Sequence, residues 1–278
     1  TTDRDRVIPY YRELFGWIPQ SVDMGTELGT YQIIHAGDRQ IGGFVDLDPT
    51  AGVPSHWIGY VSVDDVDGAG AAAVGAGGAL RMAATDIPSV GRFAIVADPE
   101  GALVCPYRSI QGYGADAPTP ADGRFCWDGL LVRDPGGAGP FYAKVFDWIP
   151  RMEDVKATPY SGVFMADGQE IAGVFSILEC GPQRAVWFPF VRCSDLEGRL
   201  NDVPRLGGSV RQTPIALSTG SRIAITADPS GALMGLLEKA DERCPPARAD
   251  SKSQMPDVSR RSAKHEAGSP TRSNYLSS

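Results

Sequence analysis

The feature that most constrains this chain is an internal repeat. Six segments of the first half return in the second, and the spacing between the two copies differs by only one position across all six pairs. Chance does not hold a spacing that constant over a chain of 278 residues, so the sequence predicts two homologous domains. The paired segments are 11–19 with 142–150, 40–43 with 170–173, 57–61 with 187–191, 77–78 with 207–208, 91–92 with 221–222, and 97–103 with 227–233.

The repeat also sets the predicted domain boundaries, which are residues 1–110 for the first domain and 124–239 for the second. Residues 111–123 are rich in Gly, Ala, Pro and Asp, a composition typical of an exposed linker. Residues 240–278 carry many Ser, Arg, Pro, Asp and Lys and few large apolar side chains. Because they have no counterpart in the first repeat, we predict a disordered tail outside the fold.

The hydrophobic pattern predicts the same short elements in each repeat. Apolar side chains spaced by three and four residues indicate a helix over 6–15, and Asp65 is a typical N-cap for a second helix that ends near 77–78. Alternating apolar residues indicate strands. In the first repeat these are 31–35, 40–47, 57–63, 80–84, 92–96 and 102–105. The fold class is therefore α+β, with tandem βαβββ units.

The second repeat opens with a predicted strand at 125–132, whose partner in the first repeat falls mostly before residue 1. The first domain thus lacks its opening strand, which leaves a sheet edge without a partner. We expect either that the sequence is truncated at its start or that the first domain recruits a strand from elsewhere.

Charge narrows the classes of partner. The net charge is −8, yet residues 241–278 hold seven Lys or Arg and five Asp or Glu, so the preceding body carries −10. An acidic body disfavours nucleic acid and anionic membrane surfaces as partners. The sequence has no apolar run of roughly 18 residues, the length of a membrane-spanning helix, and no signal-peptide core at its start. Its five cysteines are an odd number without a CxxC pair, which favours reduced thiols and a cytoplasmic location.

Three segments of the first repeat carry a family resemblance: the end of the first helix at 15–17, the strand–helix segment 56–67, and residues 85–102. Together they resemble the vicinal oxygen chelate superfamily, which includes glyoxalase I, bleomycin-resistance proteins and extradiol dioxygenases. The resemblance covers about residues 1–238 and points to its two-domain glyoxalase-like proteins. It implies that each βαβββ unit is a curled half-barrel, and that two units face each other around one concave pocket.

Catalytic members of that superfamily hold a divalent metal on strand side chains, and the resemblance allows each such position to be located here. In the first domain they are Asp46, Ile58 and Cys105, and in the second they are Gly129 beside Asp128, Ser176, Phe188 and Gly235. The second domain offers no ligand unless Asp128 reaches inward. In the first, Asp46 and Cys105 with nearby His56 form a set able to hold Zn²⁺. We expect no metal, with Cys105 a small buried hydrophobe, and keep the His56–Asp46–Cys105 set as the less favoured alternative.

The aromatic residues of the two repeats have two interpretations, packing between helix and sheet or walls of the pocket. We favour packing for each of them, but name Trp57, Tyr60, Trp187 and Phe190 as candidate ligand-binding residues.

Two arginines recur at the same point of both repeats, Arg92 and Arg222. A structural ion pair with a carboxylate, such as Asp98 or Asp228, is the favoured interpretation. The alternative is that each arginine binds an anion at the mouth of the pocket, and both are therefore candidate binding residues.

The function predicted first is the binding of a small aromatic or cationic molecule in a half-barrel pocket, without a metal and by a monomer or weak homodimer. A metal-dependent lyase or dioxygenase of the same superfamily is the alternative, and a structural or regulatory module is a third. The sequence identifies no catalytic residue.

Overall fold

The computed structural model describes residues 1–23, 30–88, 90–110, 112, 120–153, 158–177 and 184–240, with the backbone of 274–277. Most of the predicted linker (111 and 113–119) and most of the predicted tail (241–273 and 278) lie outside the described residues.

Four α-helices and sixteen strands form among these residues, in the order that the repeat predicts. The helices are α1 (Arg4–Phe15), α2 (Val66–Gly75), α3 (Pro135–Phe146) and α4 (Leu196–Arg205), with a single 3-10 turn, η1 (Pro49–Ala51). The first repeat holds β1 (Ile18–Asp23), β2 (Thr30–Ala36), β3 (Arg39–Phe44), β4 (Trp57–Ser62), β5 (Ala79–Ile87), β6 (Gly91–Ala97) and β7 (Leu103–Ser109). The second holds β8 (Phe125–Val132), β9 (Ile149–Met152), β10 (Tyr160–Ala166), β11 (Gln169–Ser176), β12 (Val186–Arg192), β13 (Ser209–Ala216), β14 (Arg222–Ala227) and β15 (Leu233–Glu238), and β16 (Asn274–Ser277) follows.

Local sequence signals set the ends of the helices. The Asp65 side chain accepts a hydrogen bond from the backbone N–H of Gly68, as an N-cap does. Gly16 ends α1 in the left-handed conformation, with φ of 72°. Among the described residues the longest helices, α1 and α3, have 12 residues each, too few to cross a lipid bilayer.

The strands form two eight-stranded sheets of identical internal order. Sheet 1 runs β1-β2-β3-β16-β4-β7-β6-β5, and sheet 2 runs β9-β10-β11-β8-β12-β15-β14-β13. Each sheet consists of two βαβββ units joined at the centre, which confirms the predicted α+β class and the tandem units.

The centre of sheet 1 is completed by the far end of the chain. β16 runs parallel to β3 and antiparallel to β4. In sheet 2, β8 pairs in the same way with β11 and β12. The recruited strand is thus found, whereas the prediction that all of 240–278 lies outside the fold is wrong for residues 274–277. The physical reason is that β3 and β4 would otherwise each present a row of unpaired N–H and C=O groups.

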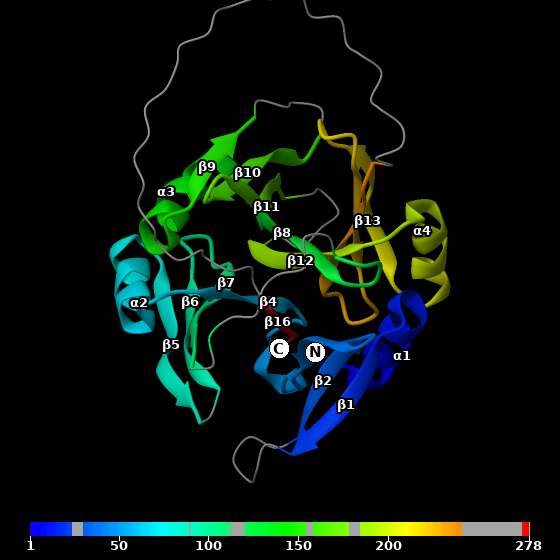
Figure 1. Ribbon diagram of the computed structural model, residues 1–278, viewed down its shortest axis with the longest axis horizontal. Helices are drawn as coiled ribbons and strands as arrows, with labels where there is room; N and C mark the ends of the chain where they lie inside the picture. Colours follow the sequence, from blue (N-terminus) through cyan, green and yellow to red (C-terminus); the bar gives the residue numbers. More distant parts are fainter. Residues whose placement is uncertain are drawn as a thin grey trace, which may run out of the picture.

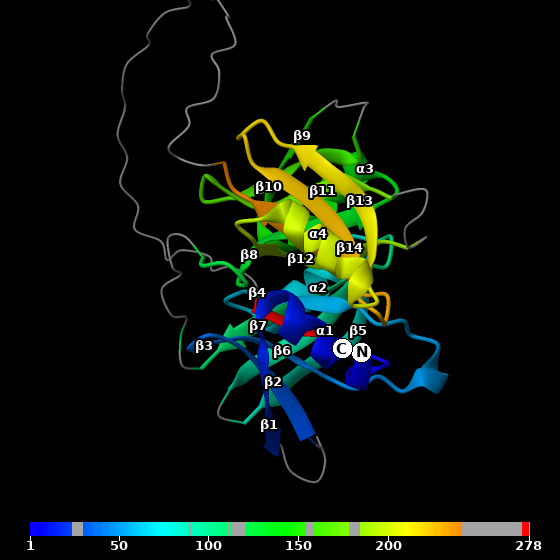
Figure 2. The same cartoon turned by 90° about the vertical axis from the view of Figure 1, so that its right-hand side faces the viewer.

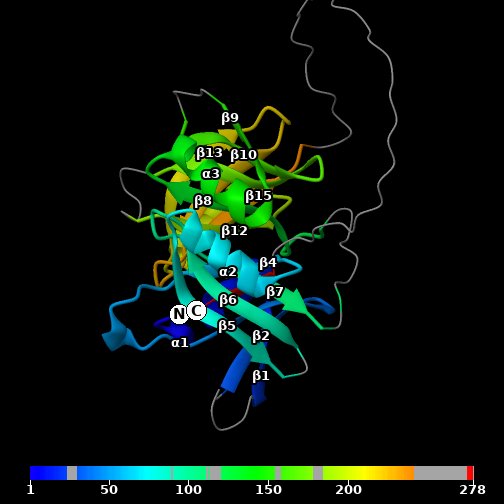
Figure 3. The same ribbon diagram turned by 90° about the vertical axis from the view of Figure 1, so that its left-hand side faces the viewer.

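The two sheets lie back to back, with β4 against β12 at the centre and one pair of helices on each side (Figure 1). Figure 1 shows sheet 1 curling away from sheet 2, so that β1 and β5 extend toward one end of the molecule and β9 and β13 toward the other. The helices stack in pairs across the domain boundary, α4 beside α1 (Figure 2) and α3 beside α2 (Figure 3). We call the face of each sheet that no helix covers its concave face.

Two mixed hydrophobic layers fill the space between the sheets. One packs α2 and α3 against strands of both domains, with Phe141, Tyr142 and Trp187 among its side chains. The other packs α1 and α4 in the same way, with Tyr11 and Trp57 at its centre. Because both layers draw residues from both repeats, the two domains share one buried core.

Each layer also contains one buried tyrosine–aspartate hydrogen bond across the domain boundary. Tyr142 on α3 donates to Asp98 Oδ2 at 2.9 Å, and Tyr11 on α1 donates to Asp228 Oδ2 at 3.1 Å. Both aspartates begin the Asp-Pro turns that repeat in the sequence. The sequence repeat thus places an equivalent polar contact on both sides of the interface.

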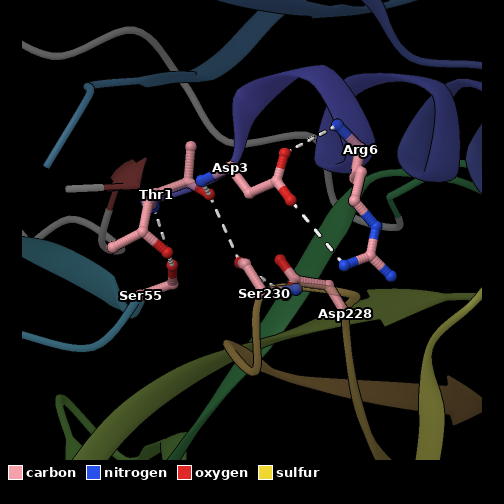
Figure 4. A network of polar contacts seen from close by, with 7 residues as sticks. Thr1, Asp3, Arg6, Ser55, Asp228 and Ser230 are labelled. Atoms are coloured by element: carbon pink, nitrogen blue, oxygen red, sulfur yellow. Dashed lines mark hydrogen bonds and ion pairs between the residues drawn. The ribbon is translucent and has the colours of Figure 1, made fainter. Parts of the chain in front are cut away.

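The turn of the second domain contacts the start of the chain (Figure 4). Thr1 Oγ1 donates to Ser230 Oγ at 3.3 Å, and Ser230 Oγ donates to Asp228 Oδ1 at 2.7 Å. Next to this contact, Asp3 caps α1 by accepting from the backbone N–H of Arg6 at 3.2 Å. The residues that precede α1 therefore belong to the contact between the domains.

Candidate functional site

The concave face of sheet 1 gathers aromatic side chains from its central and outer strands. Tyr60 on β4 is the register partner of Cys105 on β7, and Phe93 on β6 is the partner of Tyr107 on β7. Paired residues point to the same side of a sheet, and successive residues alternate. Because Val104, next to Cys105, packs in the helix layer, these four side chains lie on the opposite, concave side.

The rings on this face contact one another without being fully buried. Tyr60 meets Tyr107 edge to face, with ring centroids 5.6 Å apart, and lies 6.2 Å from the ring of Phe93. All three side chains are only half-buried. Their rings therefore retain surface on which a planar molecule can stack.

A glycine leaves room for a third phenol, that of Tyr31, on this face. A Cβ at Gly43 on β3 would overlap the hydroxyl end of the Tyr31 side chain, which comes from β2. Only glycine at position 43 therefore leaves room for the Tyr31 ring. Ile34 packs in the helix layer around α1, so Tyr31 and Ile33 on either side of it in β2 face the concave side. Gly43 faces the same side, because it is the register partner of Ile33. The Tyr31 side chain therefore extends across the concave face over Gly43, toward the centre of the sheet.

Burial reinforces the neutral state that the polar groups of this face already have near pH 7. It raises the pKa of Tyr31, Tyr60 and Cys105 well above their usual ranges. The groups that influence Tyr60 electrostatically are Cys105, Tyr31 and Tyr107, so its phenol lies among a thiol and other phenols. Near neutral pH Tyr31, Tyr60 and Cys105 thus carry no charge, and the Tyr60 hydroxyl is hydrogen-bonded to the Cys105 thiol.

The concave face of sheet 2 is filled at its centre by buried rings, and the half-buried side chains of Trp127 and Tyr160 pack against them. Phe175, Phe188 and Phe190 are fully buried there, with ring centroids 5.3 to 5.9 Å apart. Glycines of the sheet floor make room for two of these rings. A Cβ at Gly129 would lie 2.5 Å from the Phe188 ring, and one at Gly235 would overlap the Phe190 ring. The cluster consists of strand residues alone and acts as a third core.

The predicted ligand-binding tryptophans lie on the other side of their sheets. Trp57 is 1 % exposed in the layer around α1, and Trp187 is 4 % exposed in the layer around α3. Trp187 Nε1 donates to the hydroxyl of Tyr142 at 2.9 Å. Of the four aromatic candidates, only Tyr60 reaches a half-open concave face, whereas Phe190 lies in the filled one.

Both repeated arginines form ion pairs, with partners other than those predicted. Arg92 Nε lies 2.9 Å from Asp67 Oδ2, and its Nη1 lies 3.0 Å from Asp86. Arg222 pairs with Glu197 and, at 3.2 Å, with Glu238. Asp98 and Asp228 are not their partners because their carboxylates are directed into the core toward the tyrosines.

The positions implied for a metal do not form a binding set. Asp46 pairs with Arg4 at 2.6 Å, His56 Nδ1 lies 2.9 Å from the carbonyl oxygen of Pro54, and Cys105 is buried beside Tyr60. Desolvation lowers the pKa of His56. Within the described ranges no three His, Cys, Asp or Glu side chains gather closely enough to hold an ion. The side chains present therefore do not fit the metal that the fold family implies.

Sequence reasoning missed three aromatic residues of the concave face, Tyr31, Phe93 and Tyr107. Each lies on a strand that the pattern predicts at least in part, at the alternate positions that face away from the helices. The period of two was the signal that could have found them.

No family model matches this sequence. Among curated proteins the chain is similar to CFP32 of Mycobacterium bovis, a protein assigned provisionally as a glyoxylase. The two are 27 % identical over 245 residues, which cover 87 % of this chain and 93 % of the relative. The chain is also similar to the anthracycline biosynthesis protein DauV of Streptomyces sp. strain C5. Here the identity is 29 % over 199 residues, which cover 72 % of this chain and 70 % of the relative.

Two solved structures share the fold. A mutant of 4-hydroxymandelate synthase from Streptomyces coelicolor matches with a TM-score of 0.55 and 14 % identity, covering 86 % of this chain and 90 % of its own. The Mn(II)-bound glyoxalase from Novosphingobium aromaticivorans matches with a TM-score of 0.53 and 11 % identity, covering 86 % and 79 %. The fold, the repeated units and these relatives together agree with the resemblance to the two-domain, glyoxalase-like proteins of the vicinal oxygen chelate superfamily.

Proposed function

We propose that the first domain binds a small, planar aromatic molecule on the concave face of sheet 1, without a metal ion. The observation that carries the proposal is the contrast between the two concave faces. The rings of Tyr60, Phe93 and Tyr107 are half-buried, whereas Phe188 and Phe190 of the second domain are fully buried. A concave face that keeps aromatic surface open is suited to stacking and burial of a ligand.

The chemistry of the face favours a neutral or weakly polar aromatic ligand over a cation. A cation over an aromatic ring is stabilised most where a carboxylate also balances its charge. The groups that act on Tyr60 are a thiol and two phenols, not carboxylates. The relative DauV is named for the biosynthesis of anthracyclines.

The metal-dependent alternative finds less support in the side chains. The structural neighbour from Novosphingobium aromaticivorans is described as Mn(II)-bound. Here, however, Asp46 forms an ion pair with Arg4. In the second domain the rings of Phe188 and Phe190 lie directly over Gly129 and Gly235. We therefore make metal content an outcome of the test.

The test is calorimetric titration with anthracene-2-sulfonate, a planar probe whose three fused rings offer faces for stacking and whose sulfonate group makes it soluble in water. The protein is first dialysed against EDTA and then assayed for Zn, Mn, Fe and Ni by elemental analysis. We expect saturable binding by the metal-free protein. Replacing Tyr60→Leu or Phe93→Leu should weaken binding roughly threefold to tenfold, because each removes one stacking surface.

The matched control is Trp127→Leu, which removes a half-buried ring from the concave face of sheet 2. Binding to this variant should be unchanged. Loss of binding in Trp127→Leu with none in Tyr60→Leu would show that the site lies on sheet 2 and not on sheet 1. Absence of binding by the metal-free protein, with recovery on adding one of the four metals, would favour the metal-dependent alternative.

A further inference from the structure

We propose that the ligand of the first domain carries an apolar system of three or more fused aromatic rings, which lies across strands β4, β7, β6 and β5 and contacts Met82 at its outer end. This inference rests on the proposed function and specifies the size and the polarity of the aromatic ligand. It is supported by the extent of the open surface, the side chain at its outer edge, the bonding of the neighbouring polar groups and the contrast with the second domain.

Half-buried apolar side chains continue from the centre of sheet 1 toward its outer edge, where the strands follow in the order β4-β7-β6-β5. Tyr60 lies on β4 and Tyr107 on β7, and β6 contributes Phe93 and Ile95. Phe93 and Ile95 are two residues apart, so both side chains point to the concave face. Neighbouring strands are spaced so that the outer two of these four lie roughly 14 Å apart, which is more than one six-membered ring covers.

Met82 extends this surface onto β5, the outermost strand. It is the register partner of Ile95, so its side chain lies on the concave side, and it is 43 % exposed. Leu80 on the same strand is 44 % exposed, but it is the register partner of Val96, which packs in the helix layer. Of these two side chains, only that of Met82 can contact a ligand on the concave face. An unbranched thioether adapts its shape to a ring and makes favourable sulfur–aromatic contacts.

The two phenol hydroxyls along this surface are bonded within the protein. The Tyr107 hydroxyl donates to the backbone carbonyl oxygen of Val90 at 3.2 Å. The Tyr60 hydroxyl is hydrogen-bonded to the Cys105 thiol. What both tyrosines offer a ligand is therefore ring surface, which favours an apolar molecule held by stacking and burial.

The ion pairs of Arg92 lie on the other side of the sheet. Arg92 precedes Phe93 in β6, so its side chain points away from the concave face. Its guanidinium lies 2.9 Å from Asp67 on α2 and 3.0 Å from Asp86 on β5. These three charges are thus on the helix side, and a ligand on the concave face is not selected by them.

The second domain shows the same positions in a closed arrangement. The residues of sheet 2 that correspond to Phe93, Ile95 and Tyr107 are buried in its third core. They are Ile223, Ile225 and Leu237. Gln212 corresponds to Met82 and occupies the same register position in β13. An amide is readily solvated at the edge of a sheet, whereas an exposed methionine leaves apolar surface in water, so the outer end of the open surface is specific to the first domain.

The experiment compares naphthalene-2-sulfonate with anthracene-2-sulfonate, two planar probes with the same charged group and with two or three fused rings. Both are titrated calorimetrically into the full chain. We expect the three-ring probe to bind roughly tenfold more tightly, since the additional ring buries more apolar surface. Met82→Ala should weaken binding of the three-ring probe roughly threefold or more. It should leave the two-ring probe unchanged, because the rings of Tyr60, Phe93 and Tyr107 hold the shorter probe away from β5.

The matched control is Leu80→Ala, which removes an equally exposed apolar side chain from the other face of β5. Binding of both probes to this variant should be unchanged. Far-UV circular dichroism checks that each variant is folded. If Met82→Ala is not, Met82→Gln takes its place, because it introduces the residue type found at the equivalent position of the second repeat.

The outcomes separate the two proposals. Equal affinity of the wild-type chain for both probes would overturn the inference about ring number and leave the aromatic site in place. The same holds if replacing Met82 leaves the three-ring probe unaffected, weakens both probes equally, or has no larger effect than Leu80→Ala. Binding of neither probe would overturn the proposed function and this inference with it.

Discussion

The most direct test of the domain interface is removal of a single oxygen atom, in Tyr142→Phe. The hydroxyl of Tyr142 donates to Asp98 Oδ2 at 2.9 Å and accepts from Trp187 Nε1 at 2.9 Å. The side chain is fully buried between the two domains. Phenylalanine keeps the ring and its packing, so the change isolates the polar contacts from the hydrophobic ones.

The size of the effect follows from what each partner loses. A hydrogen bond to a charged group contributes about 1.5–3 kcal/mol, and a buried donor left without an acceptor costs about 1–3 kcal/mol. Asp98 keeps two other donors, the backbone N–H groups of Glu100 and Ala102 at 2.9 and 2.8 Å on Oδ1. Because these groups still stabilise the carboxylate, we expect a total loss of about 2–4 kcal/mol in the free energy of unfolding.

The assay is urea unfolding at neutral pH, followed by circular dichroism, for Tyr142→Phe, Asp98→Asn and the double variant. The cycle should give an interaction energy of about 1–2 kcal/mol between the two side chains. The control is Tyr107→Phe, because that hydroxyl bonds a carbonyl oxygen at a more exposed site. Its loss should be below about 1 kcal/mol.

The result that would refute the reasoning is a loss below about 0.5 kcal/mol in Tyr142→Phe, with an unchanged dependence on urea concentration. That outcome would mean that water or a local shift replaces the oxygen, and that the contact between Tyr142 and Asp98 does not hold the domains together.

Three further predictions address other parts of the molecule. Burial raises the pKa of Asp98 and Asp228 in the folded state, so their contribution to stability is complete below the ordinary value of 3.8 and is lost as pH rises through the folded pKa. Asp98→Asn should flatten that fall, measured by urea unfolding across a pH series. Gly235→Val should destabilise the protein by about 1–3 kcal/mol or more, since a side chain there overlaps the Phe190 ring, and thermal melting will show it. Leu276→Pro removes an N–H group from the centre of sheet 1, and hydrogen exchange at the amides of β3 and β4 should accelerate, whereas unchanged exchange would contradict the pairing of β16.

Much of the fold follows from the sequence because its signals are local. The constant spacing of the repeat predicts two domains, Asp65 and Gly16 mark helix ends, and the strand at 125–132 is β8. The apolar pattern does not predict strand β1, because its six residues include Pro19 and show no strong alternation of apolar and polar side chains. The pairing of β16 with β3 could not be predicted either, because strands from opposite ends of a chain leave no local pattern when they pair.

The site could be predicted only in part, and the reason is geometric. Trp57 and Tyr60 are three residues apart on β4, so their side chains point to opposite faces of the sheet. Trp187 and Phe190 have the same spacing on β12. Naming both members of each pair as pocket residues therefore contradicts the period of two. Choosing between them required knowing which face the helices cover, and that depends on contacts across the domain boundary.

The two repeats show how a duplicated framework lets its concave faces diverge. Gly43 and Gly173 occupy equivalent places and both let a ring lie over the floor of a sheet. The helix layers draw side chains from both domains, so their stabilisation does not depend on what either concave face contains. In sheet 2 the rings close into a buried cluster that adds hydrophobic stabilisation. Sheet 1 lacks that contribution and has half-buried aromatic side chains instead, which leave ring surface available for the binding that we propose.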